Sequence, residues 1–120
     1  MTTYAPQEVA ARTGFSLDTL RYYERIGLLD DVDRTSGGRR VYTDDHLDWL
    51  GILHCLRNSS MPVREMRHYA ELAREGDATE AQRLRILLDH RQRVLDRIAE
   101  LQEALRVVDH KIEYYRREER

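Results

Sequence analysis

The chain has 120 residues, enough for one small domain with an extension, and its 41% hydrophobic and 35% charged content is typical of a soluble protein. It has neither an apolar run of membrane-spanning length nor a secretory signal, so we expect a cytoplasmic location and no membrane partner. The net charge of −2 counts against a uniformly basic nucleic-acid binder, so such a function would depend on where the arginines lie.

Two short helices are predicted near the N-terminus, over residues 6–13 and 17–26. Gly14 ends the first helix, Ser16 can cap the second, and Gly27 supplies a left-handed residue after it. Two helices joined by so short a turn are typical of a helix-turn-helix motif.

The second helix has the composition of a DNA-reading helix, because arginine can bind base edges or phosphate and tyrosine hydroxyls can bind phosphate. Leu20, Tyr23 and Ile26 share a face, so Tyr23 belongs at least partly to the core, whereas Tyr22 points away. A lone surface arginine is usually only solvated, but the neighbouring tyrosines favour a DNA contact for Arg21. The candidate DNA contacts here are Ser16, Thr19, Arg21, Tyr22 and Tyr23.

A hairpin is predicted next, since the Ser-Gly-Gly at 36–38 tolerates left-handed backbone and Val41-Tyr42 favours a strand. Its arginines, Arg39 and Arg40, contact DNA or form a charged strand edge. Residues 1–60 hold seven arginines against nine acidic residues, but four of those arginines fall on the second helix and the hairpin. For DNA binding, the local electrostatic field around these arginines therefore matters more than the net charge of the chain.

Two further helices should pack on this unit. Thr43 can cap the first, which ends near Asn58, and Pro62 opens the second, which stops at Gly76. Tyr4, ahead of the first helix, either packs onto that helix or contacts a phosphate.

One long helix is predicted over residues 78–117, which contain neither proline nor glycine. At ~1.5 Å per residue it spans on the order of 60 Å, longer than a small domain needs. Apolar residues recur every three or four positions, a heptad seam that a second copy must cover. Arg91 interrupts the seam and either sets its register or pairs across it. The expected dimer interface is Leu84, Leu87, Arg91, Val94, Ile98, Leu101, Leu105, Val108, Ile112 and Tyr115.

Three blocks of the sequence resemble the MerR family of bacterial transcription regulators: EVAARTG at 8–14, TLRYYERIGLL at 19–29, and an arginine-rich wing ending at Tyr42. The resemblance covers almost the whole chain. It implies a mainly α fold, with a winged helix-turn-helix over 1–76 and an antiparallel coiled-coil helix over 77–120. It also implies DNA contacts at Tyr42 and at Arg57, although Arg57 could instead stabilise the end of its own helix.

The resemblance further implies a mechanism. A homodimer would bind an inverted repeat in double-stranded promoter DNA and distort an overlong spacer, so RNA polymerase would be affected only through the DNA. Two alternatives are a coiled-coil protein-interaction module and an excisionase-like architectural DNA binder without an effector. No nucleophile-base pair, phosphate-binding glycine loop or paired carboxylates suggests an enzyme, and no cofactor is expected.

Cys55 is the lone cysteine, so an internal disulfide is excluded and a thiolate metal site of the kind found in metal-sensing relatives is not expected. The neighbouring His54 and Arg57 could increase the thiolate fraction. The Leu56-Arg57-Asn58 sequence after the cysteine, and then Met61, resembles a MerR subgroup that responds to aldehydes or nitric oxide. Cys55 is therefore the candidate effector-sensing residue; the alternative is a small buried hydrophobe.

Overall fold

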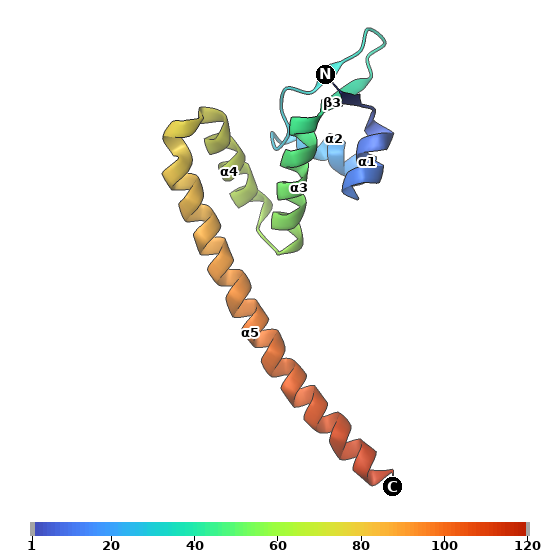
Figure 1. Cartoon of the computed structure of the whole chain (residues 1–120), viewed down its shortest axis with the longest axis vertical. Helices are drawn as coiled ribbons and strands as arrows, with labels where there is room; N and C mark the ends of the chain where they lie inside the picture. Colours follow the sequence, from blue (N-terminus) through green and yellow to red (C-terminus); the bar gives the residue numbers. More distant parts are fainter. Residues whose placement is uncertain (1, 120) are drawn as a thin grey trace. The chain divides into compact units, whose positions relative to one another are not determined.

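The computed structural model describes residues 2–119, which form mainly helices and a small sheet (Figure 1). The elements are β1 Thr3–Tyr4, α1 Pro6–Thr13, α2 Leu17–Arg25, β2 Asp33–Arg34, β3 Arg40–Thr43, α3 Asp44–Asn58, α4 Val63–Glu75, the 3₁₀ helix η1 Asp77–Thr79, and α5 Glu80–Glu118. Contacts within the chain divide it into two compact units at residues 83 and 84. The predicted mainly α fold, a winged helix-turn-helix followed by a long helix, is confirmed.

Helices α1 and α2 form the predicted helix-turn-helix. Gly14 has φ of 82°, and its N–H donates to the carbonyl of Ala10 at 3.0 Å, which ends α1. The Ser16 hydroxyl accepts the N–H of Thr19 at 3.1 Å and so caps α2. Helix α2 ends at Arg25, one residue earlier than expected.

The sheet has the order β1-β3-β2 with both pairings antiparallel. Strands β2 and β3 are the predicted hairpin, and Gly38 turns it with φ of 84°. Strand β1 was not predicted. It pairs Tyr4 with Tyr42 and so joins the N-terminus to the wing. A strand of two residues has no periodicity, which is why the sequence did not reveal it.

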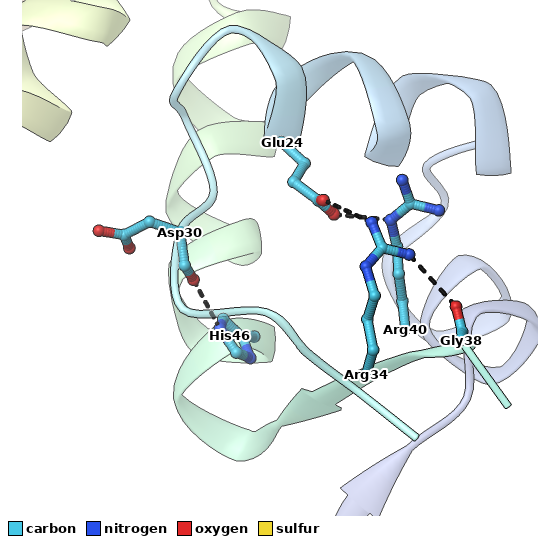
Figure 2. A network of polar contacts seen from close by, with 6 residues as sticks. All are labelled: Glu24, Asp30, Arg34, Gly38, Arg40 and His46. Atoms are coloured by element: carbon cyan, nitrogen blue, oxygen red, sulfur yellow. Dashed lines mark hydrogen bonds and ion pairs between the residues drawn. The ribbon is translucent and has the colours of Figure 1, made fainter. Parts of the chain in front are cut away.

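The core of the first unit is built from buried side chains of α1, α2, α3 and α4 and of the connection after α2. Thr43 starts α3 as predicted, in a reciprocal capping arrangement in which its own N–H donates to His46 Nδ1 at 3.0 Å. His46 Nε2 lies 3.0 Å from the carbonyl of Asp30 and so ties the start of α3 to the connection after α2 (Figure 2). Trp49 of α3 stacks on Tyr69 of α4, with ring centroids 5.8 Å apart. The fully buried side chains include Leu20, Leu28, Leu50, Leu53 and Met66.

Helix α5 begins at Glu80 rather than at residue 78, because residues 77–79 form the short 3₁₀ helix. Gly76, at φ of 87°, separates α4 from this turn. Arg83 donates to the carbonyl of Gly76 and to the hydroxyl of Thr79, both at 3.0 Å, which fixes the turn to the start of α5. Over residues 2–119, no helix is both long enough and apolar enough to cross a bilayer.

Candidate nucleic-acid interface

The outward face of α2 carries Arg21, Tyr22 and Arg25. Arg21 is exposed, and its Nη1 lies 3.4 Å from the carboxylate of Asp18, an exposed pair that holds the arginine only weakly. Tyr22 is 40% exposed, and the Arg25 guanidinium lies 5.5 Å from its ring centroid. Arg25 was absent from the predicted contact set, although its spacing of four from Arg21 indicates the same face.

The hydroxyls of Ser16 and Thr19 take part in the helix cap. They lie 2.9 Å apart, and Ser16 also accepts the N–H of Thr19. A DNA contact by either hydroxyl would therefore be made in addition to the cap, and both contacts stay predictions.

Tyr23 and Tyr42, two candidate DNA contacts, are buried. Tyr23 packs edge-on against Phe15 at 5.3 Å between centroids. Tyr42 is 0% exposed, and its hydroxyl has no hydrogen-bond partner among residues 2–119. Burial raises the pKa of both hydroxyls, because it disfavours the phenolate. The enclosed Tyr42 hydroxyl cannot reach a phosphate, so we correct the predicted set by removing Tyr42. The ring of Tyr23 belongs to the core, and a phosphate contact by its hydroxyl stays a prediction.

The wing arginines differ in their partners. The exposed Arg39 side chain forms no ion pair within the described part of the chain. Arg40 Nε lies 2.7 Å from Glu24 Oε2, and Arg34 Nη2 lies 3.3 Å from Glu24 Oε1 (Figure 2). Arg34 also donates to the carbonyl of Gly38 at 3.3 Å. One carboxylate of α2 thus binds two arginines of the wing, a relationship that the sequence pattern does not indicate.

A hollow of about 260 Å³ lies between α2, the start of α1 and the wing, and it gathers the predicted contacts Arg21, Arg39 and Arg40. Three guanidinium groups at one opening offer paired N–H donors, the geometry that phosphate oxygens accept. The hollow is lined by Pro6, Gln7, Leu17, Arg21, Gly38, Arg39 and Arg40.

A larger hollow of about 640 Å³ shares no residue with the first. Asp30, Asp31 and Asp45 line it, and Arg74 binds the Asp30 carboxylate at 2.8 Å. Its acidic border would repel a phosphate, so we do not include it in the nucleic-acid interface.

Tyr4 and Arg57, two further candidates, have internal partners. The Tyr4 hydroxyl donates to the Asp44 carboxylate at 2.6 Å, and this hydrogen bond raises its pKa. The Arg12 guanidinium lies 4.8 Å from the Tyr4 ring centroid, so Tyr4 packs on α1. Arg57 donates to the carbonyl of Met61 at 3.3 Å, which leaves other N–H groups of this exposed side chain for a phosphate.

Cys55 is exposed on α3, so the alternative of a buried hydrophobe does not describe it within this chain. The predicted neighbour His54 packs edge-on against Phe15 at 5.0 Å and lies 2.8 Å from the Asn58 amide. Within residues 2–119, His, Cys, Asp and Glu side chains nowhere form a group of three that could hold a metal ion.

The predicted seam lies along an exposed face of α5. Ile98, Leu101, Leu105, Val108, Ile112 and Tyr115 are all exposed, and Leu105 is 60% exposed. The heptad pattern omitted four further exposed apolar residues, Leu88, Leu95, Val107 and Tyr114. Lys111 lies 4.9 Å from the ring centroid of Tyr114 and 5.1 Å from that of Tyr115. The apolar surface is therefore broader than the seam alone.

Comparison with known proteins shows that this chain is similar to regulators of transcription. The family model described as "MerR HTH family regulatory protein" matches residues 4–72. An uncharacterized HTH-type transcriptional regulator of Haemophilus influenzae is 36% identical over 115 residues, which is 96% of this chain and 85% of that protein. The transcriptional regulator AdhR of Bacillus subtilis is 38% identical over 89 residues, 74% of this chain and 64% of AdhR.

A solved structure is similar over nearly the whole chain. It is that of HiNmlR, a MerR family regulator lacking the sensor domain, bound to promoter DNA. The similarity has a TM-score of 0.89 at 35% identity, and covers 97% of this chain and 92% of that one. These relatives are regulators of transcription, which points away from an enzyme.

Proposed function

Because this chain belongs to the MerR family of helix-turn-helix regulators and is a DNA-binding transcriptional regulator, we propose that it binds an inverted-repeat operator as a homodimer. The observation that carries this proposal is the hollow bordered by Arg21 of α2 and by Arg39 and Arg40 of the wing. Helix α2 enters the major groove with Arg21, Tyr22 and Arg25 facing the DNA, and the wing arginines bind adjacent phosphates.

The apolar face of α5 supports the homodimer. A row of exposed apolar side chains in water is costly, and two copies of the same helix can cover each other's rows. We propose an antiparallel pair of α5 helices. The first compact unit of each copy, called the head below, then reads one half of the operator. Such half-sites lie about 34–36 Å, or one DNA turn, apart or at a multiple of that distance.

The dimer then acts on the promoter by distorting the DNA between its half-sites. Bending and untwisting cost several kcal/mol, on the order of 1–6, so many phosphate contacts are needed to drive the distortion. RNA polymerase responds to the changed spacing of the promoter elements and not to a contact with the regulator. This takes place in the cytoplasm, where bacterial promoters lie.

The exposed thiol of Cys55 favours a second element of the proposal, the sensing of electrophiles such as aldehydes or nitrosating agents. With an aldehyde, the thiolate sulfur adds to the carbonyl carbon and the oxygen takes up a proton. Modification would shift the population between two dimer geometries on the DNA. The resemblance of Leu56-Arg57-Asn58 and Met61 to the subgroup that responds to aldehydes or nitric oxide motivates the choice of effector class.

A selection from random duplexes, with sedimentation of the same sample, tests the main proposal. We expect a symmetrical sequence to be enriched and the protein to sediment as a dimer. Arg21→Ala should abolish operator binding while the dimer persists. A wild-type protein without DNA affinity would favour the protein-interaction module. DNA bending without an effect on transcription initiation would favour the architectural binder.

A further inference from the structure

We propose that Glu24 is a counter-charge that withholds Arg34 and Arg40 from non-specific DNA and releases them to phosphates at the operator. Glu24 would thereby set the ratio of operator affinity to non-specific affinity. This inference rests on the proposed DNA-binding function and assigns a specificity-determining role to a residue that itself bears the wrong charge for DNA.

The geometry of the carboxylate carries the first step. Each Glu24 oxygen faces a different arginine, at 2.7 Å for Arg40 and 3.3 Å for Arg34 (Figure 2). The two arginines are direct cross-strand partners in the hairpin, so one carboxylate binds both strands of the wing. By contrast, Arg39 next to them forms no ion pair within residues 2–119. The wing therefore contains one arginine ready for phosphate and two that are already bound.

The environment makes this contact stronger than an ordinary surface pair. The side chains of Glu24 and Arg40 are 24% and 25% exposed, whereas the Asp18 side chain that pairs with Arg21 is 94% exposed. Partly buried pairs are less screened by salt, and a charge-assisted bond of 2.7 Å is in the strong range. Glu24 occupies the Nε–H of Arg40 and offsets its charge, so non-specific DNA must compete with this contact for Arg40.

Tyr42 provides a reason why the release can occur at all. A carboxylate that loses two guanidinium groups would be left unpaired in a half-buried place, which is costly. The Tyr42 hydroxyl is buried without a partner among the described residues, and Arg40 precedes it by two positions on the same strand. Burial raises the pKa of this hydroxyl, and the negative charge of Glu24 raises it further. We expect this unpartnered hydroxyl to be available as a donor to the Glu24 carboxylate once the arginines have left.

The position of Arg40 explains why the operator should trigger the release. Arg40 borders the hollow that Arg21 of the recognition helix also borders. When α2 is seated on its correct bases, a backbone phosphate is held at this hollow and can compete with Glu24. On other sequences α2 is not seated, and no phosphate is held there long enough to compete.

Salt titration of Glu24→Gln tests the proposal, with Asp18→Asn as a matched control that removes the same charge from the same helix. On a non-specific duplex, Glu24→Gln should bind more tightly. Its slope of log affinity against log salt should steepen by up to about 2 per head, at about 0.9 for each newly bound phosphate. The ratio of operator to non-specific affinity should fall by on the order of tenfold. Asp18→Asn should change the slope by less than half as much.

A second variant keeps the proposal testable if Glu24→Gln does not fold. In the otherwise native protein, Arg34→Gln should lower the operator slope by about 0.9 per head and leave the non-specific slope unchanged. Equal slopes for Glu24→Gln and Asp18→Asn, or a lowered non-specific slope for Arg34→Gln, would overturn the counter-charge. Failure of the native protein to bind any operator would instead overturn the proposed function.

Discussion

The indole N–H of Trp49 donates a 2.7 Å hydrogen bond to the carbonyl of Leu28. Trp49 belongs to α3 and Leu28 to the connection that follows α2. The same indole stacks on Tyr69 of α4 with an interplanar angle of 6°. Trp49 thus links α3 and α4 to the residues that follow the C-terminal end of α2.

Trp49→Phe should therefore destabilise the head. It keeps an aromatic ring against Tyr69 but removes the donor to Leu28, which costs about 1–2 kcal/mol, plus packing losses. Unfolding in urea measures the free energy of unfolding of the native protein and of the variant. Tyr22→Phe, an exposed aromatic change on α2, is the control and should be neutral. Equal unfolding midpoints for the two variants would contradict the role of the indole.

Arg39→Gln should weaken DNA binding without changing sequence preference. Arg39 is exposed and unpaired among the described residues, as expected for a phosphate contact. The salt slope should decrease by about 1 per head on operator and non-specific DNA alike. Arg97→Gln on α5, where Arg97 pairs with Glu100 at 3.1 Å, is the control. A preference altered at one base position would mean that Arg39 reads bases.

Burial of Tyr42 predicts a loss of stability at high pH. Its folded-state pKa is raised above the usual 10.0, chiefly by burial. The folded protein therefore keeps its proton where the unfolded chain has lost it. Stability should be fully present below about pH 10 and fall as the pH rises through the folded-state pKa.

Tyr42→Phe should reduce the loss of folding stability above pH 10. At neutral pH the same variant should be neutral or stabilising by up to about 1 kcal/mol, because it removes a hydroxyl without a hydrogen-bond partner from the core. Denaturant unfolding at pH 7 and above pH 10 measures both effects. Tyr22→Phe, exposed on α2 and outside the predicted seam, is the control. A loss above 2 kcal/mol at pH 7 would show that the hydroxyl has a partner.

Leu101→Glu should convert the dimer to monomers at micromolar concentration and abolish operator binding. It places a charge in the middle of the apolar seam, where it would be desolvated in the dimer. Gln102→Glu adds the same charge one position along the helix, off the predicted seam, and should remain dimeric. Sedimentation velocity distinguishes the two, and identical behaviour would argue against this seam.

Cys55→Ser should abolish the change in footprint that an aldehyde or nitrosothiol produces, while basal operator affinity stays within about twofold. Serine keeps the size of the side chain but lacks a reactive thiolate. Ser59→Ala, one turn later on the same helix region, controls for local disturbance. An unchanged response in Cys55→Ser would exclude this thiol as the sensor.

The helices could be predicted from the sequence because their ends depend on local chemistry. Gly14, Ser16, Thr43, Pro62 and Gly76 each fix a boundary within two residues of where the structure places it. These residues act through their own backbone preferences or through hydrogen bonds to near neighbours, so no tertiary information is needed.

The parts that could not be predicted depend on contacts between distant residues. Glu24 and Arg40 are 16 positions apart, and nothing in either local sequence indicates that they meet. Tyr42 was expected to face DNA, but its strand is the central one of three and packs it into the core. The arginines of α2 and the wing could be predicted as a DNA-facing group, whereas the ion pairs that they form with Glu24 could not.

Thr43 both pairs with Thr3 as the last residue of β3 and caps α3, so no flexible residue separates the wing from the helix behind it. We therefore expect β3 and α3 to move together. A tilt of the wing as it follows a bent DNA backbone should rotate the first turn of α3, and a displacement that starts in α3 should be passed on to the wing.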